Sequence, residues 1–202
     1  LPISSAITEV ERRAVTDATR RAGASDAQLI EQPMAAAIGA NLPIDEPVGN
    51  MIIDIGGGTS ETAVISLGGV VALEAVRVGS FDIDATIQSY VRREHGVAIG
   101  ERTAEEIKIH IGSAEPSAQD QSADIRGRDL VSGLPKTVRL TAEEVRFAIE
   151  EPVAAIVLSV KRCLSKAPPE LAQDFISRGI YLVGGGGMLR GLADRISRAT
   201  SV

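Results

Sequence analysis

Two clusters of glycine residues, each directly after a short apolar run, constrain this chain more than any other feature of its sequence. The first cluster is Asp54-Ile55-Gly56-Gly57-Gly58-Thr59, which follows Met51-Ile52-Ile53. The second is Gly184-Gly185-Gly186-Gly187, which follows Ile180-Tyr181-Leu182-Val183. Glycine permits positive φ angles and close approach of the backbone to a ligand. The sequence therefore predicts two strand-end turns that contact one ligand.

The first cluster has the chemistry of a phosphate and metal site. Successive backbone N–H groups in a glycine turn form a concave nest that binds anions. Asp54 could hold a divalent cation directly or through water, and Thr59 offers a hydroxyl to a phosphate oxygen or a water. A tight hairpin without a ligand is the alternative, which the flanking acid and hydroxyl disfavour. The predicted phosphate contacts are Gly56, Gly57, Gly58 and Thr59.

The second cluster, Gly184 to Gly187, lacks an acidic neighbour. It is predicted to precede a helix over 188–198, whose N-terminus would attract negative charge, and a flexible loop is the alternative. Glu105 and Lys108 lie three residues apart on a predicted helix and therefore share a face. A carboxylate can accept hydrogen bonds from ribose hydroxyls, and a lysine stem can lie along a purine. An exposed ion pair is the alternative there.

Gln32 lies at the end of a predicted strand, before a helix that Pro33 begins. Its amide can orient a water as both donor and acceptor, but it cannot act as a general base. A polar residue that only ends the strand is the alternative interpretation.

The apolar pattern predicts a three-stranded meander over 51–55, 61–67 and 70–78, followed by a region of different character. Three capping boxes predict helix starts, at Thr8/Glu11, Thr103/Glu106 and Thr141/Glu144. The third helix is expected to break near Pro152. The polar run 115–122 predicts a loop.

We expect residues 1–79 and 147–202 to form a discontinuous α/β subdomain and 80–146 to form an inserted α+β subdomain, with the ligand in a cleft between them.

Composition excludes several classes of partner. The 202 residues carry a net charge of −6, which argues against nucleic acid, and aromatic residues make up only 2%, so base-stacking platforms are nearly absent. No apolar run reaches the roughly 18 residues of a transmembrane helix. The single cysteine, Cys163, is expected to be a buried thiol, which fits a reducing compartment.

Taken in order, these segments resemble the superfamily of actin, sugar kinases and heat-shock chaperone ATPases. Within it, the chain is similar to the MreB family, the bacterial actin homologues that determine rod shape. The likeness runs over nearly the whole chain. It is carried by the following segments: Ile7-Thr8-Glu9-Val10-Glu11-Arg12-Arg13-Ala14, Ile30-Glu31-Gln32-Pro33-Met34-Ala35-Ala36-Ala37-Ile38-Gly39-Ala40, Asp54-Ile55-Gly56-Gly57-Gly58-Thr59, Thr103-Ala104-Glu105-Glu106-Ile107-Lys108, Ile111-Gly112-Ser113-Ala114, Pro168-Pro169-Glu170-Leu171-Ala172 and Gly184-Gly185-Gly186.

This resemblance implies an actin-like (ribonuclease H-like) α/β fold and a site for ATP with Mg²⁺. Residues 54–59 would be the second phosphate loop, with Asp54 as the metal ligand. Glu105, Glu106, Ile107 and Lys108 would line the adenosine pocket, and residues 184–187 would close over the adenine. Asp54, Gln32 and Thr59 would be the catalytic residues, the last two by positioning the attacking water. The family more often has Glu at position 32, so activation of that water by a base would not be retained here.

The resemblance also implies partners and a location. The intact family protein forms filaments with copies of itself in the cytoplasm, at the inner face of the membrane, where it works with membrane-bound wall-elongation proteins. The family's first phosphate loop and membrane-binding surface have no counterpart in this sequence. The chain is therefore expected to be the C-terminal half, without direct membrane contact, with weak nucleotide binding and little or no ATPase activity alone.

Two other functions stay open at this stage. One is an enzyme of the same superfamily, a sugar kinase or an exopolyphosphatase. The other is a truncated, non-catalytic paralogue that caps or modulates filaments.

Overall fold

The computed structural model describes residues 1–5, 7–116 and 121–202. The strands in these ranges are β1 (Pro2–Ile3), β2 (Ile30–Glu31), β3 (Asn50–Ile55), β4 (Ser60–Ser66), β5 (Gly69–Val76), β6 (Val97–Ala98), β7 (Ser122–Asp129), β8 (Pro135–Thr141) and β9 (Ile180–Val183). The α-helices and the 3₁₀ turns are α1 (Glu9–Arg21), α2 (Gln32–Gly39), α3 (Ser80–His95), α4 (Glu101–Ile111), α5 (Ala142–Ala148), α6 (Glu150–Lys166), η1 (Pro169–Leu171), α7 (Ala172–Arg178), η2 (Gly185–Met188) and α8 (Leu192–Thr200).

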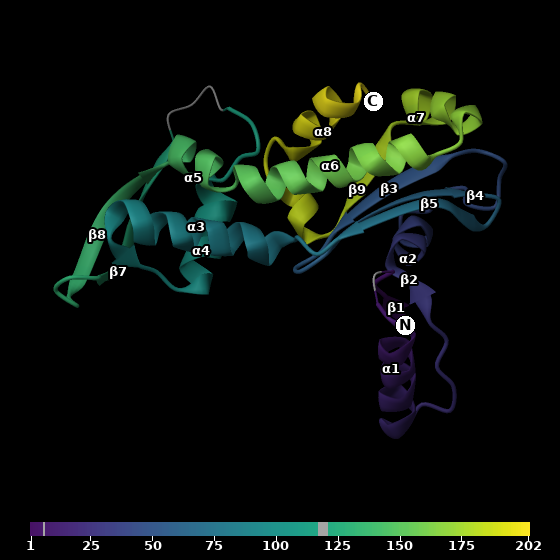
Figure 1. Cartoon of the computed structure of the whole chain (residues 1–202), viewed down its shortest axis with the longest axis horizontal. Helices are drawn as coiled ribbons and strands as arrows, with labels where there is room; N and C mark the ends of the chain where they lie inside the picture. The colour runs from purple at the N-terminus through teal and green to yellow at the C-terminus, as the bar shows by residue number, and fades with distance from the viewer. Residues whose placement is uncertain (6, 117–120) are drawn as a thin grey trace.

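The central sheet has the strand order β5-β4-β3-β9 and separates two layers of helices (Figure 1). β3, β4 and β5 form the predicted antiparallel meander, and β9 lies parallel to β3. Alternate residues of β3 point to opposite faces. Ile53 packs with the apolar face of α6, and Ile52 packs with Ala37 of α2. The sheet is therefore buried on both faces, which explains why β3 and β4 are nearly continuous in apolar residues.

A smaller sheet, with the order β6-β7-β8, lies at the other end of the molecule with α3, α4 and α5. One buried cluster joins the two ends, because Met51 and Ile53 of the central sheet belong to the same core as Ile125 and Leu140 of the small sheet. The small sheet and its hairpin fall inside the range 80–146. The division of the chain into two subdomains at those limits stays a prediction.

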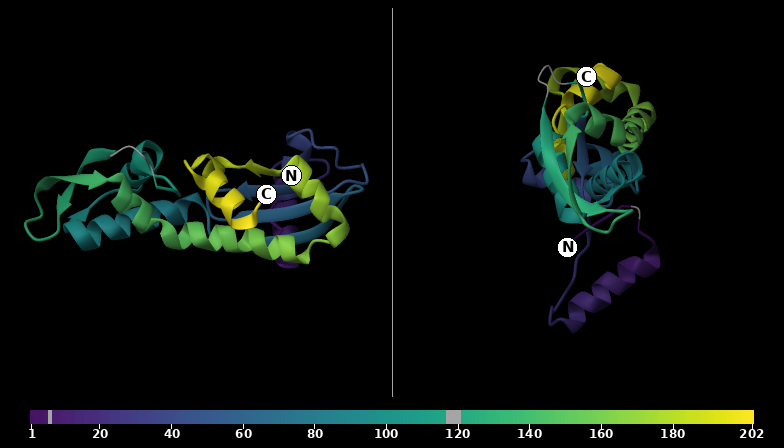
Figure 2. Two further views of the ribbon diagram at one scale, coloured as in Figure 1. Left: turned by 90° about the horizontal axis from the view of Figure 1, so that it is seen from above. Right: turned by 90° about the vertical axis from the view of Figure 1, so that its left-hand side faces the viewer.

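Helix α1 projects away from the rest of the chain (Figure 2). It begins at the predicted capping box, in which Thr8 and Glu11 bond each other's backbone N–H groups. None of its residues is buried, and Val10 is 76% exposed. Among the described residues, no helix combines the length and the apolar composition that crossing a membrane requires.

Three predicted helix boundaries differ from the structure. α4 begins after Gly100, so Thr103 lies within its first turn and caps nothing. Thr141 does cap α5, but the helix breaks at Ile149, and Pro152 is accommodated in the first turn of α6, where its missing N–H costs no hydrogen bond. The last helix begins at Leu192 rather than near residue 188. Of the loop predicted at 115–122, residues 117–120 lie outside the described residues, and Ser122 already belongs to β7.

Cys163 is fully buried on α6, and its Sγ donates to the carbonyl of Thr62 at 3.4 Å. Burial, with a smaller effect of Glu74, raises the pKa of this thiol to about 11. The reactive form is the thiolate. We therefore expect iodoacetamide at pH 8 to leave Cys163 unmodified in the native chain and to alkylate it fully in urea, as mass spectrometry would measure. Rapid alkylation without denaturant would contradict the buried assignment.

Candidate functional site

The first glycine turn joins β3 to β4 and presents free backbone donors. The N–H of Gly56 donates to the carbonyl of Thr59 at 2.9 Å, which closes the turn. The N–H groups of Gly57 and Gly58 have no acceptor within the described part of the chain. Two adjacent unpaired N–H groups at the tip of a turn are the donor arrangement that binds an anion.

The N-terminus of α3 docks on this turn. The N–H groups of Ser80 and Phe81 donate to the carbonyls of Gly56 and Gly57 at 2.9 and 2.8 Å. A Cβ at Gly79 would collide with the carbonyl oxygen of Gly57, so this approach requires glycine at position 79. The docking fixes the turn against α3 and leaves its N–H groups on the open side.

The second glycine cluster packs against the end of β3, next to the residues from which the first turn begins. Gly184 has a φ of +83°, and a Cβ there would collide with the carbonyl oxygen of Ile55 and lie 2.6 Å from Oδ1 of Asp54. Because β9 and β3 are parallel neighbours, both glycine segments leave the sheet at the same edge. Gly185 to Gly187 belong to the 3₁₀ turn η2, so the second cluster does not open the last helix as predicted.

A cavity of about 290 Å³ lies between α3, α4 and η2. Its lining combines polar groups with exposed apolar side chains and consists of Ser80, Ile83, Glu105, Lys108, Ile109, Gly185, Gly186, Met188, Leu189 and Arg190. Met188 is 85% and Ile109 is 63% exposed. Apolar walls with a few polar groups at one end are typical of small-ligand sites.

Lys108, which lines this cavity, forms a buried ion pair. Nζ of Lys108 bonds Oγ of Ser80 at 2.6 Å and Oδ2 of Asp84 at 2.9 Å. Oδ1 of Asp84 is buried without a partner. Burial raises the pKa of Asp84, Lys108 opposes that rise, and Glu105 adds to it. Lys108 is therefore paired with Asp84 and not with Glu105, as the exposed-pair alternative would require.

Asp54 faces another carboxylate across the sheet. Its direct partner on β4 is Glu61, which is 1% exposed. Burial raises the pKa of Asp54, and the Glu61 carboxylate raises it further. Among the described residues, the side chain of Asp54 has no hydrogen bond or ion pair. Two acidic groups thus lie side by side at the base of the first glycine turn.

The structure brings four of the predicted site residues into the lining of one cavity. Glu105, Lys108, Gly185 and Gly186 line the cavity, and Gly184 links it to Asp54. Gln32, Asp54 and the first glycine turn, Gly56 to Thr59, are not part of this lining, and neither are Glu106, Ile107 and Gly187. Glu106 pairs with Arg102 on the surface at 3.1 Å, Ile107 is buried in the core, and Gly187 lies against Leu182.

Gln32 is the first residue of α2, which packs against β3 and β4. The side chain of Gln32 makes no hydrogen bond within the described ranges, so its amide group can still bind a water or a ligand.

Several lining residues were not anticipated from the sequence. The sequence could have identified Ile109, because this residue alternates with Ile107 and Ile111. On a helix those two share the buried face and Ile109 points away from it, toward the cavity. Ser80, which lines the cavity, and Asp84, which pairs with Lys108, could not be identified from the sequence, because only the docking of α3 beside α4 gives them a role.

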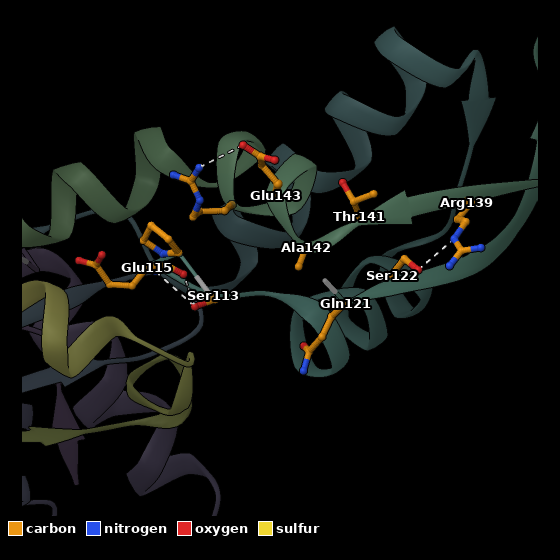
Figure 3. A pocket seen from close by; sticks show the side chains of 10 residues that line it. Ser113, Glu115, Gln121, Ser122, Arg139, Thr141, Ala142 and Glu143 are labelled. Atoms are coloured by element: carbon orange, nitrogen blue, oxygen red, sulfur yellow. Dashed lines mark hydrogen bonds and ion pairs between the residues drawn. The ribbon is translucent and has the colours of Figure 1, made fainter. Parts of the chain in front are cut away.

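A larger cavity, of about 420 Å³, lies at the small sheet (Figure 3). It is lined by Ser113, Glu115, Pro116, Gln121, Ser122, Arg139, Thr141, Ala142, Glu143 and Arg146. Arg139 donates from Nε to Oγ of Ser122 at 3.0 Å, and Arg146 pairs with Glu143 at 3.8 Å. None of the predicted site residues lines it, and its lining borders residues 117–120, so we base no site on it.

Comparison with solved structures identifies the fold as actin-like. MreB5 of Spiroplasma citri bound to ADP superposes with a TM-score of 0.94 at 37% identity, over 100% of this chain and 61% of that one. The same protein bound to AMPPNP superposes equally well. The MamK double helical filament shares the fold at a TM-score of 0.78 and 20% identity, over 98% of this chain and 58% of that one.

The sequence comparisons define the family. The model of the MreB/Mbl protein family matches residues 1–202. The chain is 48% identical to the cell shape-determining protein MreB of Escherichia coli (strain K12), over 96% of this chain and 56% of that protein. It is 43% identical to the cell shape-determining protein Mbl of Bacillus subtilis (strain 168), over 97% of this chain and 59% of that protein. The chain belongs to the MreB/Mbl family, and it spans somewhat more than half the length of these relatives.

Proposed function

We propose that this chain is the nucleotide-binding, C-terminal part of a bacterial cytoskeletal filament protein that determines rod cell shape by organising wall synthesis. One observation supports the nucleotide site: α4 and the second glycine cluster line one cavity, and Gly184 of that cluster packs against Asp54 and Ile55, where the first glycine turn begins. The relatives bound to ADP and AMPPNP support the same ligand class. The relatives named for cell shape support the biological role.

Each part of the site has a proposed task. The free N–H groups of Gly57 and Gly58, with Gly56 and the Thr59 hydroxyl, hold the phosphates. The ribose and purine occupy the cavity between α4 and η2. Glu105 accepts from the ribose, and Ile109 and Met188 contact the purine. Gly185, where a Cβ would meet nothing within 4 Å, leaves room for it, and Gly186 lets η2 pack closely on Ile55.

Asp54 is the proposed ligand for Mg²⁺. Its half-buried carboxylate has no protein partner in the described residues, and hard oxygen donors suit this ion. When bound, Mg²⁺ would neutralise charge on the phosphates. Thr59 and Gln32 would orient the attacking water without acting as a base. Self-assembly into filaments, contact with membrane-bound wall-elongation proteins, and a location at the cytoplasmic face of the membrane belong to the intact protein in this proposal.

Nucleotide binding is the direct test. Because the chain spans 56% of its Escherichia coli relative, we expect weak binding, with a dissociation constant for ADP of about 0.1–1 mM, or about −4 to −5.5 kcal/mol. Gly185→Val fills cavity space and meets no atom within 4 Å at its Cβ, so it should weaken ADP binding at least about tenfold. Isothermal titration with Mg²⁺ present measures both constants.

The matched control is Gly39→Ala on α2, where a Cβ also meets nothing within 4 Å. It should leave ADP binding unchanged. If the parent chain binds no ADP at millimolar concentration, or if both variants bind as the parent does, the proposed site is wrong.

A further inference from the structure

One oxygen of the buried Glu61 carboxylate has no hydrogen-bond partner. Glu61 is 1% exposed, and its Oε2 accepts from the backbone N–H of Ser5 at 3.0 Å. Its other oxygen, Oε1, is buried without a partner, as is Oγ of Ser5. Burying an unpaired carboxylate is costly unless another group compensates the charge. No lysine or arginine of the described residues pairs with it.

Glu61 lies beside Asp54 on one face of the sheet. The register of β3 and β4 makes these two residues direct partners. Side chains of such partners begin roughly 5 Å apart, and like charges there destabilise the sheet. The face is the one that carries Ile52 and Ala63 and that α2 covers. Both carboxylates therefore lie on the same face of the sheet, at the base of the first glycine turn.

The segment that follows β1 also reaches this part of the sheet. β1 runs parallel to β2, with Ile3 opposite Glu31. Glu31 is followed directly by Gln32, the first residue of α2. The hydrogen bond from Ser5 to Glu61 then ties this segment to β4. Ser5, Glu61, Asp54 and the N-terminus of α2 are thus neighbours.

We propose that Glu61 is the second protein carboxylate of the divalent-cation site, acting with Asp54, and that the hydroxyl of Ser5 is a further oxygen donor in that site. The phosphate-bearing ligand in this assignment rests on the proposed function, whereas the metal donors rest on Asp54 and Glu61 themselves. Among the described residues there is no group of three or more acidic, histidine or cysteine side chains that could hold a metal. Two carboxylates completed by water and phosphate are the donor set that Mg²⁺ uses.

Direct metal binding tests this assignment without any activity measurement. Mn²⁺ serves as the probe, and the loss of its free electron paramagnetic resonance signal reports binding, with and without ADP. Glu61→Gln keeps an oxygen acceptor for the N–H of Ser5 but removes the charge. It should weaken Mn²⁺ binding about 10- to 100-fold. ADP affinity in the presence of a chelator should stay within about twofold of the parent.

Glu74→Gln on β5 is the matched control, because it is the same substitution in the same sheet at a residue already paired with Lys166. It should leave Mn²⁺ affinity unchanged. Ser5→Ala removes an unpartnered hydroxyl, so it should fold normally and weaken Mn²⁺ binding several-fold. If Glu61→Gln does not show a native thermal transition, the Mn²⁺ affinity of Ser5→Ala tests the proposed metal site instead.

The outcomes separate this assignment from the proposed function. Unchanged Mn²⁺ affinity in the folded variants overturns the role of Glu61, even if the parent binds ADP. A parent that binds no ADP but binds Mn²⁺ in a Glu61-dependent manner overturns the nucleotide function and supports the two-carboxylate site. A parent that binds neither overturns both.

Discussion

Replacing Gly184 by alanine should lower the free energy of unfolding by about 2–5 kcal/mol. Gly184 has a φ of +83°, a conformation that strains any residue with a Cβ, and its added methyl would collide with the backbone of Ile55. The backbone of β3 cannot yield without disturbing its pairing with both β4 and β9. Urea denaturation, followed by circular dichroism, measures the change.

Gly185→Ala is the control for this prediction. It lies in the same cluster, has no positive φ, and its Cβ would meet nothing within 4 Å. Its stability should stay within about 0.5 kcal/mol of the parent. Equal effects at the two positions would show that the packing of the second cluster against β3 is wrong.

Replacing Lys108 by methionine should destabilise the fold by about 3–5 kcal/mol, because it leaves the buried carboxylate of Asp84 without its cation. The side chains of Lys108 and Asp84 are only 11% and 10% exposed, so solvent screens this loss little. The loss should depend on pH. Burial already raises the pKa of Asp84 in the folded chain, and removing Lys108 raises it further. A folded state that holds a proton more tightly than the unfolded state loses stability as pH rises, so the loss should be smaller at pH 5 than at pH 8.

A double variant separates the ion pair from other effects of Lys108. Lys108→Met combined with Asp84→Leu removes both charges and should recover most of the lost stability, since replacing both partners by apolar groups is close to neutral. Denaturation curves of the two single variants and the double variant complete the cycle. If the double variant is as unstable as Lys108→Met, the buried pair is not the cause.

Local chemistry made much of the fold predictable. The alternation and turns of residues 51–78 predicted the meander, and the capping boxes at Thr8 and Thr141 marked two helix starts correctly. The box at Thr103 was wrong, because α4 is extended by one turn toward Gly100. A capping box depends on hydrogen bonds within four residues only. The position of this helix also depends on tertiary packing, in which Ala104 and Ile107 are buried in the core.

The sequence by itself determined where two strand-end turns form and that an acidic residue precedes the first of them. Glycine marks these turns because it is the residue that permits positive φ angles and close backbone approach. Pairings between distant segments were decided only in the folded chain. Lys108 meets Asp84 because α4 packs beside α3. Glu61 meets Asp54 and Ser5 because β4 pairs with β3 and the segment after β1 reaches the Glu61 side chain. A charged side chain gives no sign in the sequence of what will neutralise it, since that depends on which elements exclude water around it.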